Sequence, residues 1–320
     1  MKEPTVTIIL TVKNMISTIE KCVVSLLNLN YKNKKIYVTD AFSTDGTFEK
    51  LKKYDKKIKL ETIKGNMSVA YNYMIKNINT KFIAFTDADC VVDKNWLKIL
   101  ISSFEEGVVA TGGICKTPTN VNKLQMLIGK ELENRFKRFP KFVTRLPTMN
   151  LCVRTDVAKK IKFNENLDVV QETEWNYKLG KFGKTIFNPK AIVWHYHRPT
   201  ILGYIKQQFR YGMFVPQVYL TRKYFGKITG DNISGSMMPI QIALLLLIFL
   251  SYPISIFINQ ILTVGIILSL ILLFSYLADS IKISKKISDI ILLIFLFFLR
   301  NVIWLISVIF GVLRMLSRGR

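Results

Sequence analysis

The chain has 320 residues, and its 46 lysines and arginines outnumber its 22 aspartates and glutamates to give a net charge of +24. Half of the residues are hydrophobic, and the mean hydropathy of +0.25 is high for a protein that is soluble throughout. The four cysteines are widely spaced and form no CxxC pair, which argues against a disulfide framework or a zinc site and favours a reducing compartment.

Strand and helix patterns alternate along the first 111 residues. The expected strands are Val6–Val12, Lys35–Thr39, Ile58–Ile63, Lys81–Thr86 and Val108–Thr111, and helical patterns lie between them, at Ile19–Leu27, Phe48–Tyr54, Val69–Ile78 and Asn95–Glu105. Repeated strand–helix–strand order predicts an α/β domain with a mostly parallel, doubly wound sheet. Such sheets bind ligands at the carboxyl ends of their strands.

Two carboxylates, Asp87 and Asp89, follow the strand at Lys81–Thr86, with the small Ala88 between them. A hard divalent cation prefers oxygen ligands and shares its coordination shell with substrate phosphates. The charge of such an ion stabilises a diphosphate leaving group. The pair therefore predicts a metal site, although taken alone it also fits a solvated turn.

Asp40 directly follows the second expected strand, where a carboxylate can accept a hydrogen bond from a nucleobase N–H or a ribose hydroxyl. The Asp45-Gly46 pair that follows is typical of a turn next to a helix start.

Three motifs together, Val6–Asn14, Asp40–Thr47 and Phe85–Asp89, resemble glycosyltransferase family 2, whose members have the GT-A fold. The similarity covers roughly residues 4–215. It implies that the backbone near Val12 and the side chain of Asp40 hold the nucleobase. It also implies that Asp87 faces ribose or metal and that Asp89 binds the metal, Mn²⁺ or Mg²⁺.

The chain departs from the family pattern around this nucleotide pocket. Thr11 stands where the family has Pro, Met15 where it has an acid, Ala41-Phe42 where it has Asp-Gly, and Tyr71 where it often has Arg. These changes leave a UDP-sugar and a GDP-sugar both open as the donor.

A second acidic cluster contains Gln171, Glu172, Thr173 and Glu174. Inverting transfer needs a base within hydrogen-bond reach of the acceptor hydroxyl. Aligned with the family's Glu-Asp-x-Asp, the resemblance implies that Glu172 is this base and Glu174 the later acid. The alternative is a helix start at which the helix dipole favours acids.

His195 and His197 are the only histidines, and they point to one face of an extended segment. Imidazole suits Mn²⁺ and other transition metals. The resemblance implies one histidine metal ligand here, for which we prefer His195, with His197 as a second metal ligand or a phosphate contact. The alternative is two unconnected surface histidines.

The segment Gln207–Tyr211 resembles the family's Gln-x-x-Arg-Trp element, with Tyr in place of Trp. The resemblance implies that Gln207 and Arg210 lie beside the diphosphate and the acceptor entrance, where Arg neutralises phosphate charge. An amphipathic helix at the membrane surface is the alternative, and both readings can hold together.

The hydrophobic excess lies after residue 237. Neither Met237–Ile258 nor Asn259–Ala278 contains a charge, and each is long enough to cross the bilayer as a helix of about 20 residues. We therefore expect a GT-A domain at 1–220, an interfacial connector at 221–236 and a membrane domain at 237–320, with spans at about 237–258 and 260–278.

The last apolar stretch, about 290–313, is interrupted by Arg300 and Asn301. A single span would place Arg300 near the middle of the bilayer and leave three arginines on the far side, against the positive-inside rule. We therefore predict a re-entrant or in-plane hairpin with a cytosolic C-terminus.

These features predict an inverting, metal-dependent transfer of a sugar from a nucleotide sugar to a membrane-associated acceptor, a polyprenyl phosphate or a lipid-linked glycan. The catalytic domain is expected on the cytoplasmic face of a multi-pass cell-membrane protein. The basic charge favours anionic lipid and phosphorylated substrates. Nucleic acid is not expected as a partner, because no aromatic-basic recognition motif accompanies the charge. A small processive polysaccharide synthase and a non-catalytic membrane protein that binds sugar nucleotides are the alternatives.

Overall fold

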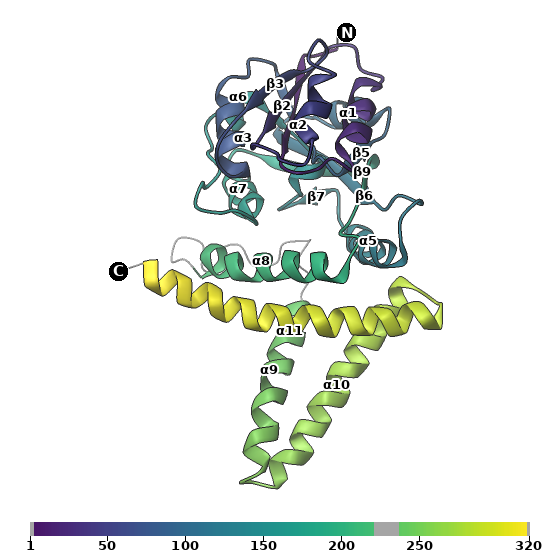
Figure 1. Ribbon diagram of the computed structural model, residues 1–320, viewed down its shortest axis with the longest axis vertical. Helices are drawn as coiled ribbons and strands as arrows, with labels where there is room; N and C mark the ends of the chain where they lie inside the picture. The colour runs from purple at the N-terminus through teal and green to yellow at the C-terminus, as the bar shows by residue number, and fades with distance from the viewer. Residues whose placement is uncertain (1–2, 221–236, 319–320) are drawn as a thin grey trace. The chain divides into compact units, whose positions relative to one another are not determined.

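The computed structural model describes residues 3–220 and 237–318 (Figure 1). The described residues divide into two compact units, one that ends at His197 and one that begins at Arg198. The predicted connector at 221–236 and the terminal Arg320 lie outside the described residues.

Within the described residues of the first unit, a nine-stranded mixed sheet has the order β3-β2-β1-β4-β8-β6-β9-β5, with β7 beside β9. The strands are β1 Val6–Val12, β2 Lys34–Asp40, β3 Lys59–Thr62, β4 Phe82–Phe85, β5 Cys90–Val92, β6 Val108–Lys116, β7 Phe142–Val143, β8 Leu151–Arg154 and β9 Lys184–His195. Strands β3, β2, β1 and β4 are parallel neighbours, as predicted. Strand β8 enters antiparallel between β4 and β6, and β5 runs antiparallel to β9.

Helices cover both faces of this sheet. They are α1 Ile19–Leu27, α2 Thr47–Lys52, α3 Met67–Lys76, α4 Trp96–Ser102, α5 Lys123–Phe136, α6 Thr155–Ala158 and α7 Gln171–Leu179. Alternate residues of β1 point to opposite faces, so Ile8 packs with the core under α1 and α4 while Ile9 packs with the core under α3 and α7. The α/β prediction is confirmed.

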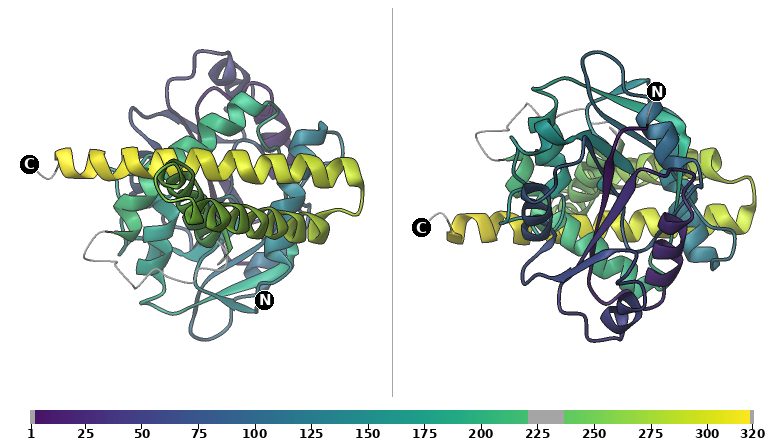
Figure 2. Two further views of the ribbon diagram at one scale, coloured as in Figure 1. Left: turned by 90° about the horizontal axis from the view of Figure 1, so that it is seen from below. Right: turned by 90° about the horizontal axis from the view of Figure 1, so that it is seen from above.

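The second unit consists of four described helices, α8 Ile201–Tyr219, α9 Met237–Ser255, α10 Gln260–Ile283 and α11 Ile287–Arg318. Helices α9, α10 and α11 are long and apolar enough to cross a membrane. α9 and α10 form a hairpin, whereas α11 lies along α8 and across the hairpin (Figure 1). In the view from below, α9 is seen nearly end-on while α11 still extends lengthwise (Figure 2).

The predicted break in the last apolar stretch is wrong, because α11 continues through Arg300 and Asn301 without interruption. Both side chains are buried, and the Asn301 amide donates to the Tyr276 hydroxyl at 2.8 Å. The guanidinium of Arg300 lies 4.9 Å from the ring centre of Phe297. Polar partners on neighbouring helices thus remove the need for a backbone break at this point.

Candidate functional site

The loops that follow β1 and β2 are joined by hydrogen bonds. Asn14 donates its backbone N–H to Ser43 Oγ, and its Oδ1 accepts from the Thr44 N–H, each at 2.8 Å. Asn14 and Phe42 both have left-handed backbones, with φ of 54° and 56°. Because strained backbones of this kind gather at functional sites, these loops mark a candidate ligand edge.

Asp40 and Val12 are direct neighbours at the ends of β2 and β1. The Asp40 carboxylate is 1% exposed and accepts from the N–H and the hydroxyl of Ser43, at 2.8 and 2.5 Å. The Val12 carbonyl accepts from the Ala41 N–H at 2.8 Å. Asp40 therefore shapes the loop through Ser43, and its contact with a nucleobase stays a prediction.

The turn predicted at Asp45 and Gly46 is present, and Gly46 has φ of 89°. Asp45 Oδ1 accepts from the hydroxyl and the N–H of Thr47, at 2.6 and 3.1 Å. Burial alone would raise the pKa of Asp45, but these hydrogen bonds and one from the Ile16 N–H outweigh it and lower that pKa.

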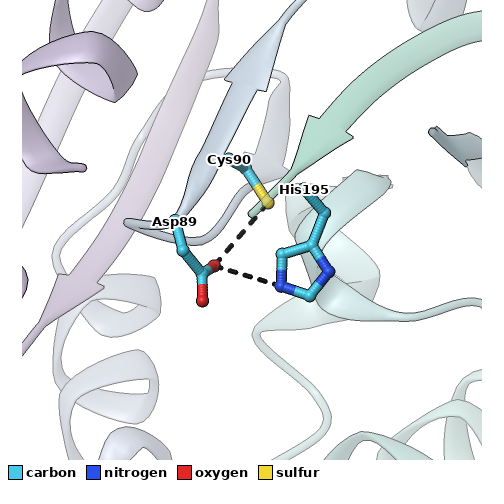
Figure 3. Close-up of side chains that lie close together, drawn as sticks. All are labelled: Asp89, Cys90 and His195. Carbon is cyan, nitrogen blue, oxygen red and sulfur yellow. Dashed lines mark hydrogen bonds and ion pairs between the residues drawn. The ribbon is translucent and has the colours of Figure 1, made fainter. Parts of the chain in front are cut away.

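Asp89 and His195 meet where β5 begins and β9 ends. Cys90 pairs directly with His195 across these strands, which brings the imidazole to the turn that carries Asp89. His195 Nε2 lies 3.4 Å from Asp89 Oδ1, and Cys90 Sγ lies 3.9 Å from the same oxygen (Figure 3). Side-chain exposures of 14% and 13% keep His195 and Asp89 open to a ligand but shielded from bulk water.

Among the described residues, three side chains with metal-ligating atoms lie close enough together to share one ion: Asp89, Cys90 and His195. Asp87 and His197, the other predicted metal ligands, are outside this group. His197 packs its ring 4.4 Å from that of His195, and its carbonyl accepts from the Gln125 amide at 2.7 Å. Cys90 was not predicted as part of this group, because its position opposite His195 depends on the pairing of β5 with β9.

Burial disfavours the thiolate form of the two cysteines beside Asp87. Cys22 Sγ donates to the Asp87 carbonyl at 3.4 Å, and the Cys90 N–H donates to the same carbonyl at 3.0 Å. Burial raises the pKa of both thiols, and the carboxylates of Asp89 and Asp87 raise it further.

Tyr71 connects the two acidic clusters. Its ring is fully buried, with ring centres 5.3 Å from Phe85 and 5.1 Å from Phe163. Burial raises the pKa of the Tyr71 hydroxyl well above its usual value, and the charges of Asp87 and Glu172 raise it further. One hydroxyl thus lies within electrostatic range of both Asp87 and Glu172.

Glu172 lies in the first turn of α7 and forms an ion pair with Arg145, with Oε1 and Nη2 2.7 Å apart. Asn176, one turn later, binds both backbone groups of Leu146, accepting from its N–H at 3.2 Å and donating to its carbonyl at 3.0 Å. This clamp fixes the loop that presents Arg145, and so it fixes the Glu172 carboxylate.

Glu174 faces a different environment. Its side chain is 7% exposed and forms an ion pair with Lys178 at 2.7 Å. Its Oε2 also accepts from the Asn164 amide at 2.8 Å. These partners hold Glu174 as part of the α7 packing.

Gln207 and Arg210 belong to α8, in the second unit. Gln207 Nε2 lies 3.4 Å from the Tyr211 hydroxyl, and Arg210 is exposed. Their place beside a diphosphate stays a prediction.

Comparison with known proteins agrees with this architecture. Residues 7–160 match the model of glycosyl transferase family 2. A dolichyl N-acetyl-α-D-glucosaminyl phosphate 3-β-D-2,3-diacetamido-2,3-dideoxy-β-D-glucuronosyltransferase of Methanococcus voltae is 26% identical over 65% of this chain and 71% of that protein. A poly-β-1,6-N-acetyl-D-glucosamine synthase of Staphylococcus epidermidis is 23% identical over 69% of this chain and 57% of that synthase.

Among solved structures, the mannosyltransferase PcManGT from Pyrobaculum calidifontis, in complex with GDP-Man and Mn²⁺, superposes with a TM-score of 0.59 at 12% identity. The match covers 97% of this chain and 88% of that one, and it supports the GT-A fold. Sequence motifs, sheet order and family match therefore agree that residues 7–160 resemble a glycosyl transferase family 2 domain, and they support a membrane-associated glycosyltransferase that uses nucleotide-sugar donors.

Proposed function

We propose that the protein is an inverting, metal-dependent glycosyltransferase that acts on an acceptor held at the membrane. The observation that carries this proposal is the approach of the Asp89 carboxylate to the His195 imidazole, at 3.4 Å, where β5 begins and β9 ends.

The donor set fits a divalent cation. Two ligand atoms that neighbour each other on one ion, at bond lengths near 2.1 Å, lie about 3 Å apart, close to the separation of Asp89 Oδ1 and His195 Nε2. A carboxylate paired with an imidazole suits Mn²⁺ better than Mg²⁺, which prefers oxygen ligands throughout. The ion would supply positive charge to the diphosphate of the donor. The Mn²⁺ in the PcManGT complex supports this assignment.

Glu172 is the proposed base. Arg145 engages Oε1 of its carboxylate, which orients the group and assigns Oε2 to accept the proton of the acceptor hydroxyl. The neighbouring Tyr71 hydroxyl is kept protonated by burial and by the charges of Asp87 and Glu172. Its O–H therefore stays a hydrogen-bond donor, within a side chain that is fully buried.

The acceptor is proposed to be lipid-linked. Three long apolar helices keep the enzyme in the membrane, and the Methanococcus voltae relative is named for a dolichyl phosphate-linked substrate. A cytoplasmic catalytic domain and a UDP- or GDP-sugar donor belong to the same proposal. The poly-N-acetylglucosamine synthase relative favours processive synthesis as a second candidate, which product length separates from a single transfer.

The experiment is a donor panel on membranes that contain the full chain, with Mn²⁺, Mg²⁺ or a chelator. We expect transfer that the chelator abolishes and Mn²⁺ restores, and a loss of about 10²–10³-fold in Asp89→Asn and His195→Ala. Asp156→Asn changes an exposed acid on α6 and serves as the control. Transfer that survives the chelator, or that Asp89→Asn leaves intact, would overturn the metal-dependent proposal.

A further inference from the structure

Helix α11 meets the α9–α10 hairpin near its ends. The Asn301 amide contacts the Tyr276 hydroxyl at 2.8 Å and Gln241 Oε1 at 3.4 Å. Gln241 lies in the second turn of α9, and Tyr276 lies about two turns before α10 ends. Asn301 itself is close to the middle of α11. The centre of α11 is therefore level with one end of the hairpin.

The depth of this contact in the membrane does not fit an α11 that spans the bilayer. At 1.5 Å per residue, Gln241 lies about 6 Å from the start of α9, and Tyr276 lies about 10 Å from the end of α10. The hydrocarbon core is about 30 Å thick, so the centre of a spanning helix lies about 15 Å deep. α9 is 19 residues long and just matches the core. The polar pair Arg300 and Asn301 therefore lies near one surface, where such residues cost least.

The C-terminal half of α11 packs along α8, in the same direction. Trp304 Nε1 donates to Gln208 Oε1 at 2.9 Å, and the Arg314 guanidinium lies 4.5 Å from the ring centre of Phe214. Between these contacts, a Cβ on Gly212 would lie 1.9 Å from Ser307 Oγ. α8 carries exposed Lys206 and Arg210 and is not among the helices that could cross a membrane. Because α11 runs along α8, the two helices have the same orientation relative to the membrane.

The exposed apolar residues of α11 follow one another at helical spacing and form a single stripe. They are Ile287, Ile291, Phe295, Phe298, Ile306, Ile309, Phe310, Leu313 and Leu316. A stripe on one face, with the other face packed on α8 and on the end of the hairpin, is the pattern of a helix that lies in the membrane surface.

We propose that α11 lies in the plane of the membrane surface beside α8, with its apolar stripe against the acyl chains of one leaflet. Among the described helices, α9 and α10 then cross the membrane. The α10–α11 turn and the C-terminus lie on one side, and the α9–α10 turn lies on the other. This arrangement keeps Arg314 and the lysines of the α10–α11 turn on the same side, as the positive-inside rule favours.

Cysteine labelling in sealed vesicles of known orientation tests this topology on the full chain. Lys285→Cys, Asn259→Cys and Ser317→Cys replace exposed residues at the two turns and near the C-terminus. The natural cysteines, Cys22, Cys90, Cys115 and Cys152, are buried, so the unsubstituted chain sets the background. We expect an impermeant maleimide to label Ser317→Cys and Lys285→Cys from one face and Asn259→Cys from the opposite face. Labelling of Ser317→Cys from the face of Asn259→Cys would overturn the proposal.

Depth measurements separate an in-plane helix from a tilted span independently of glycosyl transfer. Spin labels at Ile291→Cys, Phe298→Cys and Ile309→Cys sample the exposed stripe, and one at Leu246→Cys samples the middle of α9. We expect the three α11 labels to share one shallow depth and the α9 label to be deepest. A steady change of depth along α11 would contradict the proposal, whatever the activity of the enzyme.

Discussion

Glu172 and Glu174 lie two residues apart on α7, yet their carboxylates meet different partners. Glu172 contacts Arg145 with 18% of its side chain exposed, whereas Glu174 is 7% exposed and held by Lys178 and Asn164. A base must reach the acceptor, and a group packed against its own helix does not. The difference in burial therefore supports Glu172 as the proposed base and Glu174 as a structural residue.

Glutamine substitutions separate these roles. Glu172→Gln should lower transfer to a hydroxyl acceptor by about 10²–10⁴-fold and leave donor affinity unchanged, because only proton abstraction is lost. Glu174→Gln should instead lower the unfolding free energy by about 2 kcal/mol, through its charged hydrogen bonds, and largely spare kcat. Initial rates, donor titration and thermal melting measure these effects. A stable Glu174→Gln protein without transfer would reverse the assignment.

The Glu172→Gln variant also distinguishes the two possible acceptors. A phosphate monoester is already anionic near neutral pH and needs no base, unlike a sugar hydroxyl. Glu172→Gln should therefore impair transfer to a lipid-linked glycan far more than transfer to a polyprenyl phosphate.

Val170 holds a strained backbone immediately before Glu172. Its φ of 56° is left-handed, which is a rare conformation for a β-branched residue. Strain of this kind costs about 1–3 kcal/mol in the folded state, and glycine would relieve it. Glycine also raises the conformational entropy of the unfolded chain, which offsets part of this gain. Val170→Gly should therefore raise the unfolding free energy by about 1 kcal/mol. Transfer should fall because the start of α7 loosens.

Val169→Gly is the matched control, since Val169 has no left-handed backbone. It should lower the melting temperature, as glycine normally does. If Val170→Gly destabilises the protein as much as Val169→Gly does, the backbone of Val170 stores no strain.

At the scale of elements, the sequence predicted what local pattern encodes. Strand β1 has its predicted bounds, and α1 begins and ends where the apolar spacing placed it. Strand β8 was not predicted, because its role is to pair antiparallel with β4 and β6, which lie far away in the chain. Such pairing depends on contacts that no local period shows.

The site was predictable to a similar extent. Motifs placed Asp40, Asp89, Glu172 and His195 at strand and helix ends. They did not show that Ser43 would cover the Asp40 carboxylate or that Arg145 would reach Glu172 across 27 residues of chain. Both contacts depend on loop conformation, which side-chain hydrogen bonds determine.

Helices α8 and α11 approach each other so closely at Gly212 that no side chain fits there. Gly212→Ala would place a Cβ 1.9 Å from Ser307 Oγ and 3.1 Å from Ser307 Cβ. Overpacking costs about 1–3 kcal/mol, whereas alanine normally stabilises a helix relative to glycine by about 1 kcal/mol. We therefore expect Gly212→Ala to lower the melting temperature.

Ser307→Gly removes both contacts and should restore stability in the double variant. A double-mutant cycle on melting temperature, with transfer measured in parallel, isolates this coupling. A stabilising Gly212→Ala, or additive effects in the double variant, would show that the helices do not meet as described.

At the scale of the whole chain, the last apolar segment shows where sequence reasoning fails. Arg300 and Asn301 suggested a break because an unpartnered charge inside an apolar helix is costly. The structure instead supplies Gln241 and Tyr276 from α9 and α10, so the helix continues. Polarity along a segment predicts a need for partners, and only the assembled helices show whether the partners exist.

The in-plane position of α8 and α11 has a consequence for the shape that the bilayer experiences. Helices of 19 and 32 residues, about 10 Å wide and 1.5 Å long per residue, displace roughly 750 Å² of one leaflet, while the hairpin occupies only two helix cross-sections in the other. The protein thus takes up more area in one leaflet than in the other. It should concentrate where the leaflet that faces α8 is convex and loosely packed, so the curvature of a membrane would help to decide where its glycans are made.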